Sequence, residues 1–161
     1  DRHLYHHSNS SIYDGFPELV QYMKSKFNSI DIETGLREVE RYLYLASTTS
    51  IGGFSMPLSS PGDNILHELI LQTPYYHKIC YDILPGRKYI HHKSFFDGEN
   101  VVYKNVENTK KMVLFMMEYI KKYGIIEDKA STFWNLFQGR KSIEEINSQL
   151  LIFLEKGKTN V

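Results

Sequence analysis

The chain has 161 residues, a length typical of one domain. Hydrophobic residues make up 42% of it and aromatic residues 14%, whereas a disordered chain has few aromatics and a large net charge. The 19 basic and 19 acidic residues give a formal net charge of zero, so no overall positive field attracts nucleic acid or an anionic membrane. No stretch approaches the roughly 20 apolar residues of a membrane-spanning helix. We therefore expect a soluble, cytoplasmic domain with neither a nucleic-acid nor a membrane partner.

The single cysteine, Cys80, excludes an internal disulfide and a zinc site built from several cysteines, and it favours a reducing compartment. The sequence opens at Asp1 with neither a methionine nor an apolar signal segment, so we expect it to be cut from a longer chain. Residues 1–12 are polar and rich in histidine. We expect them to form a flexible tail, and residues 13–161 to form a single helical domain.

Apolar residues recur at helical spacing through most of that domain. In the second of the helices that this spacing predicts, the charged residues between Arg37 and Arg41 are expected to point mostly outward. In the last, Ser142 and Glu145 have the spacing of a capping box. No alternating run predicts paired strands, so we expect an all-α fold, a compact bundle of about six helices. These helices cover about residues 14–27, 32–46, 61–83, 106–123, 130–137 and 142–157.

Two features interrupt the helical pattern. Pro74 lies inside the third predicted helix and removes one backbone hydrogen bond, so we expect a kink or a break between Leu71 and Thr73. Leu84-Pro85-Gly86 then ends that helix, and residues 87–105 form an irregular connection. Within this connection Val101 to Tyr103 has the composition of a short strand, but the chain offers it no strand to pair with.

Asp63, His67, His91 and His92 are candidate metal ligands. Asp63 and His67 are four residues apart on a predicted helix and therefore share a face. His91 and His92 follow the turn that ends this helix, and a connection that folds back would bring one of them near His67. Two or three imidazoles with a carboxylate suit zinc or non-haem iron. Asp63 would be a third ligand or would hold a histidine in the correct tautomer.

A structural role explains the same four residues. In this interpretation Asp63 caps its helix and His67 hydrogen-bonds to Asp63 or to a loop carbonyl. His91 and His92 are then ordinary loop residues bonded to backbone groups. The spacing from His67 to His91 matches no standard ligand motif, so the sequence leaves both interpretations open.

Tyr76, Cys80 and Met116 are candidate binding residues. As a nucleophile Cys80 would need a histidine, and His77 lies three residues earlier, but no acid or amide partner is evident and a buried inert thiol is favoured. Met116 is typical either of an adaptable groove for an apolar ligand or partner helix, or of gap-filling core, and the core is favoured. The motifs G-x-S-x-G, H-E-x-x-H and C-x-x-C are absent from the sequence.

A longer pattern of residue types begins at Met56 and ends at His92. It reads Met56-Pro57, Asp63-x-x-Leu66-His67-x-x-Ile70-Leu71-x-Thr73, Tyr76-x-x-x-Cys80, and Gly86 followed by Ile90-His91-His92. This pattern resembles the glycine-rich-domain-containing protein-like family, and weaker similarity extends it from about Glu38 to Trp134. Leu66 stands where the family has tryptophan. The resemblance supports the choice of the Asp63 and histidine cluster but implies no particular reaction.

The sequence leaves two functions open. In the first, a small domain binds a divalent metal, zinc or iron, through the histidine and aspartate cluster and activates water for hydrolysis or takes part in oxygen chemistry. In the second, the chain is a non-catalytic binding or accessory protein, and the same cluster is a structural hydrogen-bond network. The sequence does not identify a protein or small-molecule partner for either.

Overall fold

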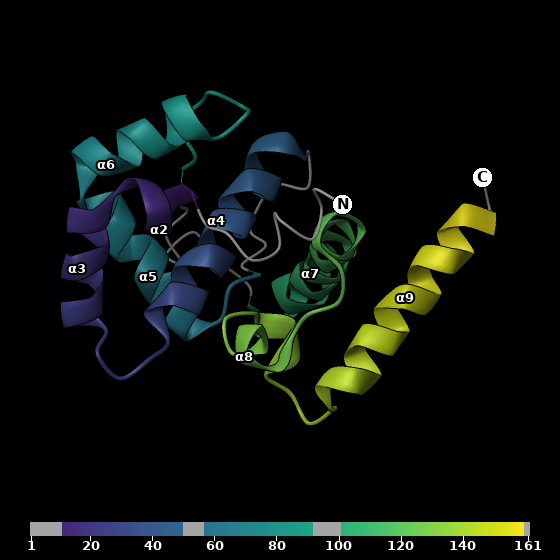
Figure 1. Cartoon of the computed structure of the whole chain (residues 1–161). Helices are drawn as coiled ribbons and strands as arrows, with labels where there is room; N and C mark the ends of the chain where they lie inside the picture. Colours follow the sequence, from purple (N-terminus) through teal and green to yellow (C-terminus); the bar gives the residue numbers. More distant parts are fainter. Residues whose placement is uncertain (1–10, 50–56, 92–100, 160–161) are drawn as a thin grey trace.

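The computed structural model describes residues 11–49, 57–91 and 101–159. These parts of the chain contain eight α-helices and no β-strand, so the all-α prediction is confirmed (Figure 1). A π-helical turn (Ile79–Ile83) continues α6, and a 3-10 turn (Asn135–Phe137) follows α8. The α-helices are α2 (Ser11–Gly15), α3 (Pro17–Lys26), α4 (Ile32–Thr48), α5 (Ser60–Leu71), α6 (Thr73–Lys78), α7 (Val101–Tyr123), α8 (Asp128–Ser131) and α9 (Ile143–Thr159).

The helix count exceeds six because two predicted helices are divided. The first is divided at Phe16, after which Pro17 begins α3. The third ends as α5 at Leu71, and α6 begins at Thr73, so the break predicted from Pro74 is confirmed. Proline suits the first turn of a helix because the N–H that it lacks would have no intrahelical acceptor there. Each proline therefore marks the start of a new helix.

Two predicted boundaries are wrong. Helix α7 begins at Val101, so the end of the predicted connection is helical and Val101 to Tyr103 form no strand. Ile12, placed in the tail by the sequence, lies in α2 and is fully buried. The N–H groups of Ser11 and Ile12 donate to the Glu40 carboxylate, which fixes the start of α2 on α4. The remainder of the predicted tail, residues 1–10, lies outside the described residues.

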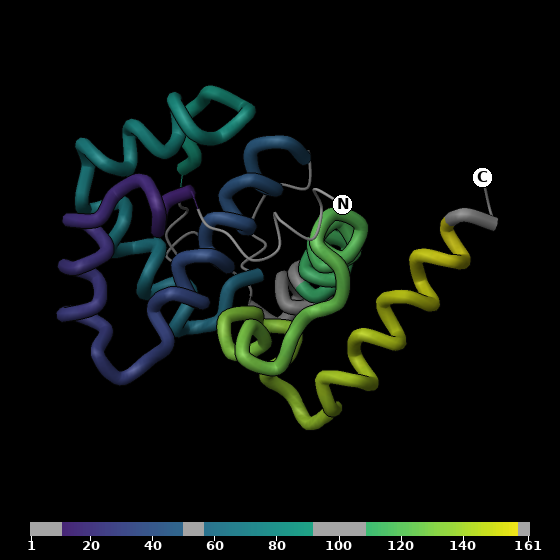
Figure 2. The backbone as a smooth tube through the Cα atoms, viewed as in Figure 1, coloured from purple at the N-terminus to yellow at the C-terminus, as the bar shows by residue number. Residues whose placement is uncertain are grey.

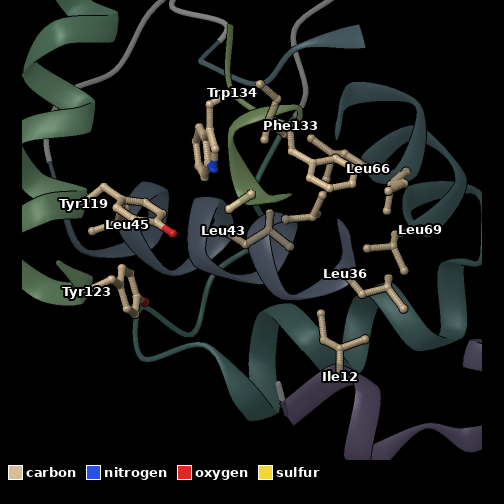
Figure 3. Close-up of a cluster of buried hydrophobic side chains, with 14 of the residues drawn as sticks. Ile12, Leu36, Leu43, Leu45, Leu66, Leu69, Tyr119, Tyr123, Phe133 and Trp134 are labelled. Carbon is tan, nitrogen blue, oxygen red and sulfur yellow. The ribbon is translucent and has the colours of Figure 1, made fainter. Parts of the chain in front are cut away.

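Helix α4 is the central element of the fold, in contact with α2, α5, α7 and α8. Its apolar stripe includes Leu36, Val39 and Leu43, none of which has exposed surface. In Figure 2 the chain before α7 surrounds one side of α4, whereas α7 and then α9 follow on the other. Figure 3 shows Leu36 and Leu43 packed near Leu66, which α5 supplies. The core is thus organised along both sides of one helix.

A short extended contact connects the start of α5 to the end of α8. Ser59 N donates to Phe133 O at 3.0 Å, and Asn135 N donates to Pro57 O at 2.7 Å. The Ser59 hydroxyl adds a hydrogen bond to Thr132 O. This contact places the segment after α8, including the fully buried ring of Trp134, against α4 at Glu38 and against α7 at Tyr119.

Among the described helices, none combines the length and the hydrophobicity that crossing a bilayer requires.

Candidate functional site

Asp63 and His67 form the pair that their spacing predicts. His67 Nε2 lies 3.6 Å from Asp63 Oδ2, one turn apart on α5. The side chain of His67 is about half exposed, and that of Asp63 is 26% exposed. The pair is therefore a surface feature of α5, in contact with solvent.

His91 is held by a different group of side chains. Its ring lies 4.9 Å from the ring of Tyr89, which in turn meets Tyr76 edge-on at 5.3 Å. The Tyr76 hydroxyl donates to Ile90 O at 2.7 Å, which anchors this part of the chain to α6. His91 itself is exposed. Its ring is thus positioned by aromatic neighbours rather than by a carboxylate.

The described residues do not assemble the predicted ligand set. No three histidine, cysteine, aspartate or glutamate side chains among residues 11–49, 57–91 and 101–159 lie together as metal ligands. Asp63 and His67 are brought together, but His91 does not join them in such a group. His92 lies outside the described residues, so a site that includes it stays a prediction.

The three candidate binding residues lie in the interior. Tyr76 is 1% exposed, and Cys80 and Met116 have no exposed surface, so none of them presents a surface to a partner. Cys80 occupies the π-helical turn, and its thiol faces the Tyr76 hydroxyl. Burial raises the pKa of that hydroxyl, and the neighbouring thiol adds to the effect. These positions agree with an inert thiol and with a core methionine.

A group of buried polar side chains surrounds Glu38 on α4, which has no exposed surface. Glu38 Oε1 accepts hydrogen bonds from Tyr119 Oη at 2.5 Å and from Trp134 Nε1 at 2.8 Å. Glu38 Oε2 accepts one from Arg37 Nε at 2.8 Å and lies 3.3 Å from Arg41 Nη1. Figure 3 shows the rings of Tyr119 and Trp134 beside α4. We call these five residues the Glu38 network.

The two arginines of this network differ in their surroundings. Arg41 Nη1 donates to Tyr119 Oη at 2.6 Å, and its guanidinium lies 4.6 Å above the ring of Tyr123. Arg37 Nη2 lies 3.9 Å from the exposed carboxylate of Glu127. Burial raises the pKa of the Tyr119 hydroxyl, and the charge of Glu38 raises it further. Tyr119 is therefore a neutral donor between a carboxylate and a guanidinium.

Reasoning from the sequence missed the Glu38 network. The charged residues between Arg37 and Arg41 were expected to point mostly outward, and this is wrong for Arg37, Glu38 and Arg41, all at most 8% exposed. A run of alternating charges on a helix is typical of a solvated face, so the pattern on α4 alone favours exposure. The hydrogen-bond partners on α7 and after α8 are 81 and 96 residues away in the sequence. No local spacing connects them.

Comparison with known proteins leaves the function open. No family model, curated protein or solved structure matches this chain. The resemblance of Met56 to His92 to the glycine-rich-domain-containing protein-like family accordingly stays a prediction.

Proposed function

We propose that the chain is a cytoplasmic, non-catalytic helical bundle that acts as a binding or accessory domain. The observation that carries this proposal is the environment of Glu38. Its two carboxylate oxygens accept three hydrogen bonds and form a close ion pair, all with side chains of the fold. A carboxylate whose oxygens are occupied in this way joins helices and is poorly placed to accept a proton from a substrate.

The surface pair of Asp63 and His67 fits the same proposal. An exposed pair one helical turn apart stabilises a helix by a few tenths of a kcal/mol and needs no ligand. His91 has a comparable structural explanation, because Tyr89 and Tyr76 hold it in place. In this view Asp63 and His67 stabilise α5, and His91 stabilises the segment after the π-helical turn.

A metal-binding domain is the second candidate, and the 3.6 Å separation of His67 and Asp63 favours it. With His91 and His92 the donor set would suit zinc or iron, and the resemblance to the glycine-rich-domain-containing protein-like family supports the choice of these residues. Activation of water for hydrolysis, or oxygen chemistry, would then be the chemistry that the metal supplies.

Elemental analysis of untagged protein separates the two candidates. The tail histidines His3, His6 and His7 are replaced by alanine throughout, because they could bind metal adventitiously. For a non-catalytic domain we expect no stoichiometric zinc or iron after incubation with either metal and dialysis. We also expect His67→Ala to change the free energy of unfolding by less than about 1 kcal/mol, as for other exposed pairs.

The control is His77→Ala, which removes another exposed histidine, on α6. One zinc or iron ion per chain, retained in His77→Ala and lost in His67→Ala, would contradict the non-catalytic proposal and support the metal site.

A further inference from the structure

Residues 84–91 form a turn at the edge of the molecule, beyond α6 in Figure 1. We call it the basic turn. Two close contacts fix it to the fold. A Cβ added to Gly86 would lie 2.7 Å from Ser47 O, so the turn meets the end of α4 with no room for a side chain. Further along, Ile90 O accepts the hydrogen bond from the Tyr76 hydroxyl. The three residues between these contacts are all exposed.

Arg87 has a backbone conformation that is unusual for its residue type. Its φ of 47° lies in the left-handed region, which glycine and asparagine adopt far more readily than arginine. The glycine beside it does not take this conformation, because Gly86 serves the close contact with Ser47 instead. A sparsely populated backbone at an exposed basic residue indicates that the side chain is needed for function.

Basic groups outnumber acidic ones in this part of the chain. Residues 77–91 contain one acidic side chain, Asp82, and five exposed basic ones, which are His77, Lys78, Arg87, Lys88 and His91. Among the described residues, the Arg87 guanidinium makes one hydrogen bond, from Nη1 to Tyr81 O at 3.4 Å, and no described carboxylate pairs with it. The planar fork of an arginine suits a carboxylate, which it can bind through two parallel hydrogen bonds.

The aromatic neighbours of the turn favour a carboxylate ligand over a nucleobase. The ring of Tyr81 lies 4.5 Å from that of His77, and the ring of Tyr89 contacts those of Tyr76 and His91. Single-stranded nucleic acid is bound by bases that stack on aromatic faces, together with contacts to phosphate. Tyrosines that already contact other rings are poorly placed for such stacking, and the chain has a formal net charge of zero.

We propose that the basic turn binds an acidic segment of a partner protein, with one glutamate or aspartate carboxylate on the Arg87 guanidinium and a second at Lys88. This inference rests on the proposed function, because it names the partner chemistry of the binding domain. The contacts at Gly86 and Ile90 hold the turn in place before the partner arrives, so little conformational freedom is lost on binding. Because the basic groups are exposed, salt should weaken the complex.

Fluorescence anisotropy of a labelled peptide of alternating glutamate and serine, titrated with the full chain at low salt, tests the proposal. We expect this peptide to bind and a counterpart with glutamine in place of glutamate not to bind. We expect Arg87→Asn to weaken binding about tenfold or more, because it removes charge-assisted hydrogen bonds. Asparagine suits the left-handed backbone, so this variant should melt no lower than wild type.

Two further variants separate a bidentate contact from general attraction. Arg87→Lys keeps the charge but loses the planar fork, so we expect a weakening of about threefold. Arg140→Asn is the matched control, the same substitution at an exposed arginine before α9, and should leave affinity within about twofold. Wild-type protein that does not bind the glutamate peptide at about 1 mM would overturn the inference, as would equal weakening by Arg140→Asn. Wild-type affinity in Arg87→Lys would overturn the bidentate contact.

Labelled oligothymidylate in the same assay tests the other class of partner. Tighter binding of this single strand than of the peptide, lost in Arg87→Asn, would overturn the assignment to an acidic segment and indicate nucleic acid instead. The failure of this inference is distinguishable from that of the proposed function. Stoichiometric metal that depends on His67 contradicts the non-catalytic function, whether or not the peptide binds. A metal-free chain that does not bind the peptide contradicts only the role of the basic turn.

Discussion

Glu38 holds a negative charge inside the protein, surrounded by donors from three segments of the chain. An isolated buried carboxylate would cost several kcal/mol, and the hydrogen bonds from Tyr119, Trp134 and Arg37 offset that cost. The dependence is mutual, because Arg37 and Arg41 are themselves at most 8% exposed and need the carboxylate as their counter-charge. Removal of Glu38 would therefore leave two buried cations without the carboxylate that they share.

We expect Glu38→Ala to lower the free energy of unfolding by about 3–5 kcal/mol, the usual cost of breaking a buried ion pair from one side. Urea denaturation followed by fluorescence measures this change directly. Trp134 is the single tryptophan of the chain and donates to Glu38, so its emission in the native state should also shift.

Glu33→Ala is the control for this prediction. Glu33 lies in the first turn of the same helix but is exposed, so its loss should change the free energy of unfolding by about 0.5 kcal/mol or less. Equal destabilisation by the two variants would show that the Glu38 network does not stabilise the fold.

The break between α5 and α6 shows which features of an element the sequence predicts well. Proline lacks an N–H and restricts the residue before it, so the effect of Pro74 is covalent and local. The capping box of α9 is equally local, and its two hydrogen bonds, Ser142 N to Glu145 and Glu145 N to Ser142, are present as predicted. The π-helical turn at Ile79–Ile83 was not predicted, because no residue type there enforces the wider turn.

Replacement of glycine by alanine is expected to have opposite effects on stability at Gly62 and at Gly157. A Cβ added to Gly62 in α5 would lie 2.9 Å from the carbonyl oxygen of Phe133, which is backbone and cannot rotate away. We expect Gly62→Ala to destabilise the protein by about 1–3 kcal/mol through overpacking. A Cβ at Gly157 in α9 meets nothing within 4 Å. Gly157→Ala should stabilise by roughly 0.5 kcal/mol, because alanine loses less entropy in a helix.

Thermal unfolding of both glycine variants beside wild type measures the two shifts in melting temperature. Shifts of the same sign would contradict the close approach of α5 to Phe133. The sequence could not have predicted the difference, because Phe133 is 71 residues from Gly62 and the two meet only through the contact of residues 57–59 with the segment after α8.

At the scale of the whole molecule, the all-α class could be predicted and the site could not. Apolar spacing identifies helices because each turn repeats the same contacts locally. The Glu38 network and the separation of His91 from the Asp63 and His67 pair depend instead on how helices pack, which local spacing does not encode. The burial of three tyrosines could not be predicted from local spacing for the same reason. Tyr76, Tyr119 and Tyr123 become interior only when α6 and α7 pack on the rest of the chain.

These three tyrosines contribute to the way in which stability depends on pH in alkaline solution. Burial is the main cause that raises the pKa of each hydroxyl above its value of 10.0 in an exposed tyrosine. After burial, the second cause differs among the three. The neighbouring Cys80 raises the pKa of Tyr76, and the charge of Glu38 raises the pKa of Tyr119. The charge of Arg41 lowers the pKa of Tyr123 and so partly opposes the effect of burial there. Between pH 10 and the raised values, the unfolded chain releases protons that the folded chain keeps. Stability is therefore complete below pH 10 and falls as the pH rises further.

We expect these three tyrosines together to lower the free energy of unfolding above pH 10 by up to about 4 kcal/mol per pH unit, because each contributes about 1.4 kcal/mol. Urea denaturation at a series of alkaline pH values measures this slope, and phenolate absorbance reports when the buried hydroxyls ionise. Tyr123→Phe keeps the ring beside Arg41 but removes one ionisable group, so its slope should be shallower by about 1.4 kcal/mol per pH unit. Ionisation of all tyrosines while the chain remains folded would contradict the burial of these hydroxyls.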